Sequence, residues 1–368
     1  MMEKYQNIFM NFKTGSGGKM TEKEMEQAKR AKLKREKPFV YEKVLKIADR
    51  HAAGIPTPIV DIAYSTVCNL KCLHCSARRL TPKKHKLTPE VLKNFTSQAD
   101  ALGLCQLNLS GGEPLLFTPL DKIFEALQPD KFHLSMSSNG HFVTLEKAKE
   151  LKKMGLDKIK ISLDDFDEAK HDANRMDTGA YQKAMKAFFA AQEAGLSVVV
   201  QTVVTHENCC TSRTVKMAEF CQENGFTLDV MLAKAIGAWE GKHEVLCDGK
   251  DLQFLKEVHD SIPALHLDTF PTYGIDRGCG TVDSTIHMTP YGDILPCVFI
   301  HISLGNIFEE SLETILKRGK SIKHFAEYHP CCLSGMDRNF INKYMSKFYG
   351  KEIPISWKDA FTKEDFIQ

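Results

Sequence analysis

Residues 59–75 read IVDIAYSTVCNLKCLHC, an apolar run that passes directly into three closely spaced cysteines. Residues 59–66 have the composition of a buried strand, and Cys68, Cys72 and Cys75 follow with CxxxCxxC spacing. Three thiolates in one short loop can bind three irons of a cubane [4Fe–4S] cluster and leave the fourth iron open to a small molecule. A zinc knuckle is the alternative, but a closed zinc site needs four ligands. The spacing therefore favours an iron–sulfur cluster.

From residue 58 onward, strand and helix patterns alternate, which is typical of βαβ units and a parallel sheet. We expect six units, and hence an α/β fold built as an open, partial (β/α)6 TIM-like barrel. A small C-terminal iron–sulfur domain follows it. The predicted strands are 59–66, 106–110, 132–138, 158–163, 197–205 and 227–233. The predicted helices lie near 88–102, 118–128, 144–154, 180–194 and 212–224. The predicted segments are 1–57, 58–235 for the barrel, 236–340 for the iron–sulfur domain and 341–368 as a tail.

Composition excludes several classes of protein. Of 368 residues, 49 are Lys or Arg and 47 are Asp or Glu, so the formal net charge is +2, and 43% are hydrophobic. These values argue against a disordered chain and against nucleic acid as a partner. No apolar run approaches the roughly 18 residues of a membrane span, and residues 1–20 lack an apolar signal core. We therefore expect a cytoplasmic protein, in which twelve cysteines favour metal ligands over disulfides.

The segment Gly111-Gly112-Glu113-Pro114 follows the second predicted strand, about 35 residues beyond the cysteine loop. Two glycines allow the backbone to approach a ligand closely, and a carboxylate can accept hydrogen bonds from a ligand ammonium. Together, the two motifs make the sequence resemble the radical S-adenosylmethionine (radical SAM) enzymes. His74 stands where that family has an aromatic-type residue before its third cysteine.

The resemblance implies that the methionyl group of SAM chelates the open iron. One electron then cleaves the sulfonium, and a 5′-deoxyadenosyl radical takes a hydrogen atom from the substrate. By analogy, the cluster ligands are Cys68, Cys72 and Cys75. The cofactor-binding residues implied by the resemblance are His74, Gly111, Gly112, Glu113, Pro114, Ser138, Asn139, Ser162, Asp164, Arg175 and Val203. For Asp164, a helix N-cap is the alternative, and we interpret His171 as a surface or capping histidine.

A second cysteine set, Cys279, Cys297, Cys331 and Cys332, lies beyond the predicted barrel. With a hairpin expected around residues 291–293, this region resembles the auxiliary-cluster region of the SPASM/twitch radical SAM subfamily. It lacks the seven cysteines of the full SPASM pattern, so the resemblance implies the shorter twitch form with one auxiliary [4Fe–4S] cluster. Either all four thiols bind it, or only one of the adjacent pair does. A structural zinc site is the alternative.

The other cysteines have weaker interpretations. Cys105 fits a core position. Cys209 and Cys210 are a redox pair or, more in keeping with their loop position, unreactive thiols. Cys221 and Cys247 have no partner that the sequence identifies.

Residues 1–57 contain 13 Lys or Arg against 7 Asp or Glu. This excess is typical of a solvated helix packed across the first strand; a dock for an acidic partner or a membrane surface is the alternative. Nothing in the segment predicts the alternating strands of a leader-peptide recognition domain.

The predicted function is therefore that of a radical SAM oxidoreductase. We expect it to oxidise a small-molecule biosynthetic intermediate with help from the auxiliary cluster and an electron donor such as flavodoxin or ferredoxin. The alternative is modification of a peptide or protein by cross-linking, thioether formation or side-chain oxidation. A non-enzymatic iron–sulfur or zinc-binding module is a remote third class. The sequence identifies no catalytic acid or base.

Overall fold

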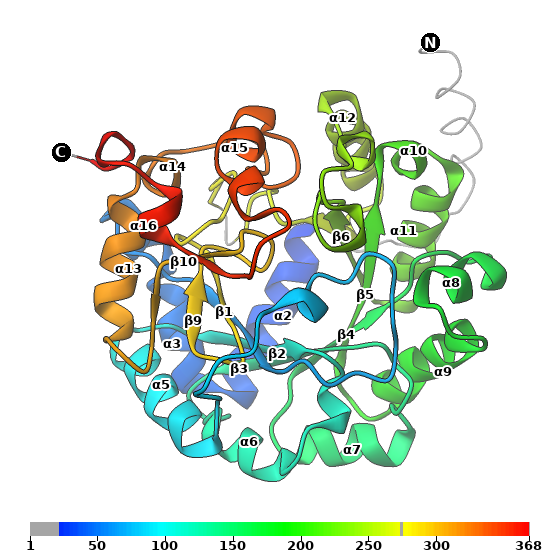
Figure 1. Ribbon diagram of the computed structural model, residues 1–368. Helices are drawn as coiled ribbons and strands as arrows, with labels where there is room; N and C mark the ends of the chain where they lie inside the picture. The colour runs from blue at the N-terminus through cyan, green and yellow to red at the C-terminus, as the bar shows by residue number, and fades with distance from the viewer. Residues whose placement is uncertain (1–21, 273–274, 368) are drawn as a thin grey trace.

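The computed structural model describes residues 22–272 and 275–367 (Figure 1). Ten strands form one sheet in the order β11-β9-β8-β1-β2-β3-β4-β5-β6-β7. The first six are β1 Ile59–Ser65, β2 Gln106–Gly111, β3 His133–Ser138, β4 Lys158–Ser162, β5 Ser197–Val204 and β6 Thr227–Leu232. All six pair in parallel in chain order, so the predicted partial barrel is confirmed.

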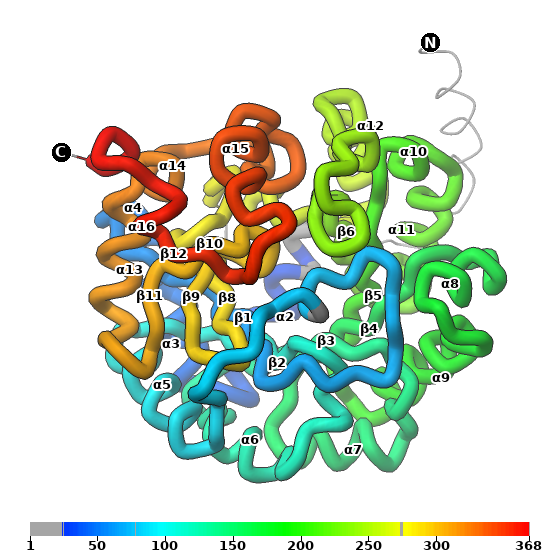
Figure 2. Tube along the Cα trace, in the orientation of Figure 1, coloured from blue at the N-terminus to red at the C-terminus, as the bar shows by residue number. Residues whose placement is uncertain are grey.

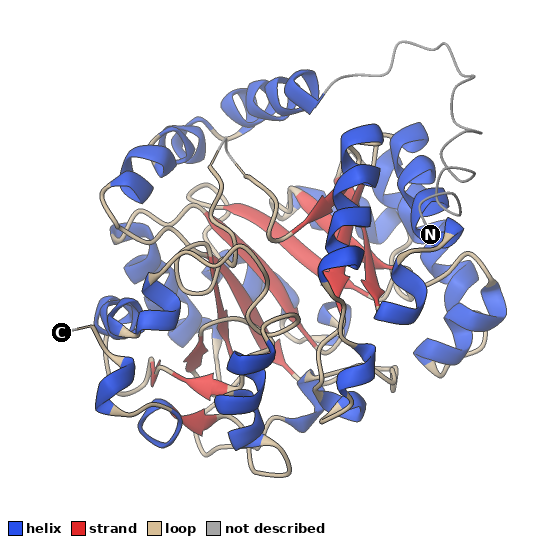
Figure 3. Cartoon of the chain, turned by 90° about the horizontal axis from the view of Figure 1, so that it is seen from above, coloured by secondary structure: helices blue, strands red, loops and turns tan. Residues whose placement is uncertain are grey.

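The helices that connect these strands lie around the sheet (Figure 3). Their predicted positions agree with the structure because caps fix their ends: the Thr88 and Thr144 side chains each accept a hydrogen bond from the first turn of their helix. The helices of this part are α5 Pro89–Ala101, α6 Leu120–Ala126, α7 Leu145–Lys153, α8 Glu168–Arg175, α9 Ala180–Glu193, α10 His206–Cys209, α11 Ser212–Asn224 and α12 Gly249–Ser261. The sequence patterns missed α8, α10 and α12.

The C-terminal region continues the barrel sheet at both of its edges. At one edge, β7 (Leu265–Leu267) pairs in parallel with β6. At the other, β8 (Thr285–Met288) lies parallel to β1, and the predicted hairpin turns it into the antiparallel β9 (Asp293–Leu295) and then β11 (Gly305–Asn306) (Figure 2). The iron–sulfur region therefore shares the sheet of the barrel. Buried apolar residues of both parts form one continuous core.

The segment predicted as a tail is ordered against this region. In a second, two-stranded sheet, β12 (Ile355–Ser356) pairs in parallel with β10 (Ile302–Ser303). The Tyr344 hydroxyl also donates to Asp365 at 2.5 Å. The helices here are α13 Leu312–Ser321, α14 Lys323–Ala326, α15 Arg338–Lys343 and α16 Trp357–Ala360. The four segment boundaries given above stay predictions.

The basic N-terminal segment covers the amino ends of the barrel strands. It contains α2 Glu22–Glu36, α3 Pro38–Leu45 and α4 Ile47–Ala52, while residues 1–21 lie outside the described part of the chain. Lys37 forms an ion pair with Asp157 at 2.5 Å, and Lys43 forms one with Asp100 at 2.6 Å. Cys105 packs against the apolar side of these helices, as expected of a core thiol. These two cations of the segment therefore serve packing against the barrel.

Candidate active site

The three cysteines of the CxxxCxxC loop lie beyond the carboxyl end of β1. Cys68 is exposed, whereas Cys72 and Cys75 are half-buried. Partial desolvation of its sulfur is the main cause of a raised pKa of Cys68, and the charges of Glu113, Cys72 and Cys75 raise it further. Two N–H groups point at the Cys68 sulfur: Leu70 N at 3.4 Å and Asn139 Nδ2 at 4.0 Å. The loop thus brings three thiols together near hydrogen-bond donors, which is a donor set that fits an iron–sulfur cluster.

The paired glycines hold this loop against β2. Gly112 N donates to Ser65 O and Glu113 N donates to Val67 O, both at 2.8 Å. Gly111 has φ +111°, and a Cβ on either glycine would collide with the backbone of residues 65–67. The close approach predicted from this motif is therefore to the cysteine loop itself. Pro114 is buried and begins a 3₁₀ turn, Pro114–Leu116.

Glu113 is fully buried beside the loop. Its carboxylate accepts hydrogen bonds from Ser138 Oγ and from Asn139 N, each at 2.8 Å. No cation pairs with it among the described residues, and burial raises the pKa of Glu113 to about 7. Ser138 and Asn139, predicted as cofactor-binding residues, thus position Glu113. A ligand ammonium would satisfy the buried charge.

A second polar group gathers around Asp164, just past the end of β4. Arg175 Nη2 lies 2.8 Å from Asp164 Oδ1, and Arg175 Nη1 lies 3.8 Å from the Cys72 sulfur. Burial alone would raise the pKa of Asp164, but the charge of Arg175 holds it below its ordinary value. Within residues 22–272 and 275–367, Asp164 Oδ2 and Arg175 Nε are buried without a hydrogen-bond partner. Such orphaned atoms beside Cys72 fit a polar ligand.

The surroundings of Asp164 exclude the alternative given for that residue and correct the interpretation of His171. Asp167, not Asp164, caps α8, since its side chain accepts from Ala169 N and Lys170 N. His171 is 1% exposed and its Nδ1 accepts from Asp164 N at 3.0 Å, so it is neither a surface nor a capping residue. Burial also lowers the pKa of His171 to about 4, which keeps the ring neutral.

Three other predicted residues lie near this group. Burial lowers the pKa of His74 to about 4, with the charges of Asp164 and Arg175 contributing in opposite directions. Ser162 is half-buried at the carboxyl end of β4, and Val203 is half-buried near the end of β5. Arg213, on α11, was not among the predicted residues, and its Nε donates to Asp164 O at 2.6 Å.

The C-terminal cysteines form a second centre. The thiols of Cys279 and Cys332 share a hydrogen bond, which, with the nearby charge of Lys234, holds the pKa of Cys332 well below its ordinary value. The charge on Cys332 also contributes to a raised pKa of Cys297, behind burial. Cys331 instead faces solvent in part, and after burial its pKa is raised by Asp337 and Cys332. The structure thus groups Cys279, Cys297 and Cys332, with Cys331 beside them.

Lys234 was missed by the sequence reasoning. It follows β6, is 6% exposed, and donates to Leu232 O at 2.6 Å. Its ammonium lies 4.7 Å from the centroid of the Phe299 ring. A single Lys in a loop carries no sequence signal for this position, because the fold alone brings it to Cys332.

Polar side chains line the inner face of the barrel strands. Leu107 and Leu109 of β2 pack into the core, whereas Asn108 alternates with them and donates to Asp61 of β1. The same Asp61 carboxylate accepts from Ser110 Oγ at 2.8 Å and lies 2.7 Å from His287 Nδ1.

A second set lies across the lumen. Lys160 Nζ and Gln201 Nε2 both lie 3.1 Å from Asp229 Oδ2. Against the effect of burial, Asp229, Asp268 and Asp61 raise the pKa of Lys160, so its ammonium is retained. The lumen therefore offers both charges and several hydrogen-bonding groups.

Comparison with known proteins identifies the family. Residues 62–217 match the radical SAM superfamily, and residues 279–334 match the SPASM iron–sulfur cluster-binding domain. A probable GTP 3′,8-cyclase of Thermoplasma volcanium is 30% identical over 238 residues, which cover 62% of this chain and 71% of that protein.

The chain belongs to the radical SAM superfamily. Its two family matches imply [4Fe–4S] clusters and SAM as cofactors of this radical SAM enzyme. The AdoMet-dependent heme synthase of Nitratidesulfovibrio vulgaris is 22% identical over 307 residues, 72% of this chain and 83% of that protein. The fold is similar to that of Streptococcus suis SuiB bound to precursor peptide SuiA, with a TM-score of 0.57 at 18% identity over 75% of this chain and 68% of SuiB. In the described part of the radical SAM enzyme, no helix combines the length and apolarity that crossing a membrane requires.

Proposed function

We propose that this radical SAM enzyme abstracts a hydrogen atom from a small polar molecule bound in the barrel lumen and completes a net two-electron oxidation. The observation that carries this proposal is the polar lumen, in which the Asp61–His287 pair faces the Lys160–Asp229 pair. A molecule with several hydroxyl, amino or acid groups would find partners on at least four strands. An apolar substrate would displace water from these charged pairs without offering them any hydrogen bond in exchange.

Cys68, Cys72 and Cys75 would hold the SAM-binding cluster, and Glu113 would accept the methionyl ammonium. When bound, the cluster and SAM supply the 5′-deoxyadenosyl radical, the species that takes the hydrogen atom. Asp164 and Arg175 each keep one unpaired polar atom for the cofactor. Ser162 ends β4, Val203 lies near the end of β5, and His74 lies in the cysteine loop after β1; all three would complete the cofactor site.

For an auxiliary cluster, Cys279, Cys297 and Cys332 are the proposed ligands. Cys332 has the lowered pKa that a thiolate ligand needs. Lys234 would keep positive charge beside this centre and so favour its reduced form, as acceptance of an electron from the substrate requires. A flavodoxin- or ferredoxin-like donor would supply the first electron.

Peptide modification is the second candidate function. It is favoured by the fold similarity to SuiB, which is named as bound to a precursor peptide. A peptide would have to present one side chain to the lumen, and its affinity would depend mainly on contacts outside Asp61 and Lys160.

Two measurements test the proposal. After anaerobic reconstitution, we expect about eight irons per chain in wild type and about four in the Cys68/Cys72/Cys75 triple-Ala variant, which should form no 5′-deoxyadenosine. Normal 5′-deoxyadenosine formation by the triple variant would refute the cofactor assignment.

The second measurement addresses the substrate. We expect the small-molecule filtrate of a cell extract, but not its peptide fraction, to stimulate 5′-deoxyadenosine formation. Lys160→Met should abolish the stimulation and keep the slow uncoupled cleavage of SAM. Stimulation by the peptide fraction that survives Lys160→Met would favour the second candidate.

A further inference from the structure

Three thiols and a carboxylate that neither proposed cluster site uses gather between α10 and the start of α12. Cys209 ends α10, and Cys210 follows it directly. Cys247 and Asp251 flank the start of α12, about forty residues later in the chain. Helices α10 and α12 are neighbours at the upper right of Figure 1. Neither family match assigns a role to these residues.

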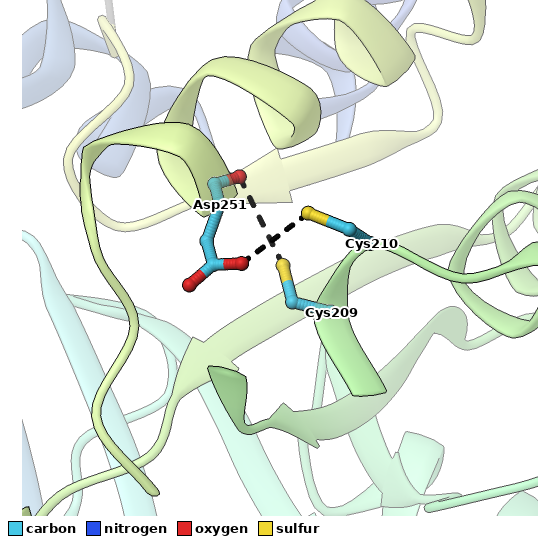
Figure 4. Close-up of side chains that lie close together, drawn as sticks. All are labelled: Cys209, Cys210 and Asp251. Atoms are coloured by element: carbon cyan, nitrogen blue, oxygen red, sulfur yellow. Dashed lines mark hydrogen bonds between the residues drawn. The ribbon is translucent and has the colours of Figure 1, made fainter. Parts of the chain in front are cut away.

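Three of the four side chains, those of Cys209, Cys210 and Asp251, lie close together. Cys210 Sγ lies 3.2 Å from Asp251 Oδ1, and Cys209 Sγ lies 3.8 Å from the Asp251 carbonyl oxygen (Figure 4). One ligand atom from each of Cys209, Cys210 and Asp251 lies within 4.8 Å of the others. The Cys209 thiol is also in hydrogen-bonding contact with the thiols of Cys210 and Cys247.

These distances are close to the distances between neighbouring ligand atoms in a tetrahedral metal site. Around zinc, with Zn–S about 2.3 Å and Zn–O about 2.1 Å, two sulfurs lie about 3.8 Å apart and a sulfur and an oxygen about 3.6 Å apart. Little movement of Cys209, Cys210 and Asp251 is therefore needed to place a metal between them. Cys247 interacts with Cys209 and is the proposed fourth ligand, but its sulfur lies outside the close group of the other three and must move toward Cys210 and Asp251 to join them.

The surroundings favour a closed site. Cys209 is 0%, Cys247 1% and Asp251 2% exposed, so three of the four groups are shielded from water. His206 Nδ1 lies 2.7 Å from Asp251 Oδ2, and Asp248 N donates to the same oxygen at 2.8 Å. These contacts fix the carboxylate and leave Oδ1 directed at Cys210, as an outer-shell partner does for a metal-ligating carboxylate.

We propose that Cys209, Cys210, Cys247 and Asp251 bind one zinc-class divalent ion. Binding displaces the thiol protons, one from each cysteine, and the ion then forms bonds to three sulfurs and to Asp251 Oδ1. The ion would fasten the loop after β5 to the start of α12. It would have a structural role, because four protein ligands leave no open position for substrate. The proposal does not depend on the substrate of the enzyme.

The same thiols could instead form a disulfide between Cys209 and Cys247, or remain reduced in the core. A reduced Cys210 thiol would keep its hydrogen bond to the Asp251 carboxylate, and a Cys209–Cys247 disulfide would leave that contact in place. Zinc ligation alone bonds all four groups to a metal, and this difference makes the alternatives separable by experiment.

Zinc content and zinc K-edge X-ray absorption of the anaerobically purified holoenzyme test the proposal, because both read zinc independently of cluster iron. We expect about one zinc per chain, with about three sulfur neighbours at about 2.3 Å and one oxygen at about 2.1 Å. Cys209→Ser and Cys210→Ser should each lower zinc at least tenfold, with iron unchanged.

Two further variants distinguish loss of a zinc ligand from misfolding of the chain. Asp251→Asn keeps an oxygen for the α12 cap while removing the charge, and we expect it to replace the zinc–oxygen ligand or to lower zinc occupancy. Cys221→Ala, which removes a buried thiol on α11, is the matched control and should retain full zinc. Less than about 0.1 zinc per wild-type chain, equal zinc in wild type and Cys209→Ser, or a Cys209–Cys247 disulfide in peptide mass spectra would each overturn the proposal.

Discussion

Adding one methyl group at Gly112 should push the cysteine loop away from the end of β2. In Gly112→Ala, the new Cβ would lie 2.5 Å from the Val67 carbonyl carbon and 2.8 Å from that of Thr66. Carbon atoms in contact are normally about 3.5–4 Å apart. Backbone atoms cannot rotate away as a flexible side chain can, so β1 and β2 must move apart at this point.

The size of the effect follows from the contacts that are lost. Overpacking costs about 1–3 kcal/mol. The hydrogen bonds from Gly112 N to Ser65 O and from Glu113 N to Val67 O contribute about 0.5–1.5 kcal/mol each. The free energy of unfolding should thus fall by about 2–6 kcal/mol. With an unfolding entropy of about 0.8 kcal/mol/K for 368 residues, the Tm falls by about 3–8 °C.

The assay is circular-dichroism melting of the chelated, cluster-free chain, followed by iron analysis after reconstitution. We expect Gly112→Ala to lose about four irons per chain, because the loop no longer presents its three thiols together. Gly249→Ala is the control: its backbone φ is ordinary and nothing lies within 4 Å of a Cβ there, so Tm and iron should be unchanged. A Gly112→Ala variant with wild-type Tm and full iron would refute the packing argument.

Three other outcomes are expected. Burial raises the pKa of Glu113 to about 7, so the folded chain holds this proton more tightly than the unfolded chain does. As the pH rises from about 4.5 to 7, the free energy of unfolding of the cluster-free chain should fall by roughly 3 kcal/mol, and its Tm should fall with it. Glu113→Gln should make the Tm nearly independent of pH over this range. Arg175→Met leaves the Asp164 carboxylate buried without its ion-pair partner and should lower the free energy of unfolding in urea by about 3–5 kcal/mol. Adding Asp164→Asn should recover part of this loss. A double variant that is no more stable than Arg175→Met would contradict this account. Cys332→Ala should remove about four irons and Cys331→Ala none; equal losses in both would show that the adjacent thiols act together.

Much of the barrel could be predicted because its signals are local. The six predicted strands agree with the structure to within about one residue at each end, since apolar runs and helix caps such as Thr88 act over a few residues. The CxxxCxxC loop is likewise local, because Cys68, Cys72 and Cys75 lie within eight consecutive residues and are therefore close in any compact loop. Short helices such as α8 and α10 were missed because they contain too few residues to show the 3.6-residue spacing of apolar side chains.

The remaining features depend on packing between distant segments. Only the fold shows that His171 and Arg213 both contact Asp164, and that β8 extends the sheet beside β1. The same holds for Cys209 and Cys247, whose separation in sequence predicts no contact.

The amino-acid sequence by itself determined the α/β class, the succession of the six barrel strands and the residues available to bind a cluster, because each is encoded within a single loop or a single βαβ unit. Tertiary structure alone decided which polar groups share a buried space: Glu113 with Ser138, Asp164 with Arg175, Cys279 with Cys332. The physical reason is that a buried charge or thiol takes its chemistry from its neighbours. Those neighbours are chosen by how helices and strands pack, not by their distance along the chain.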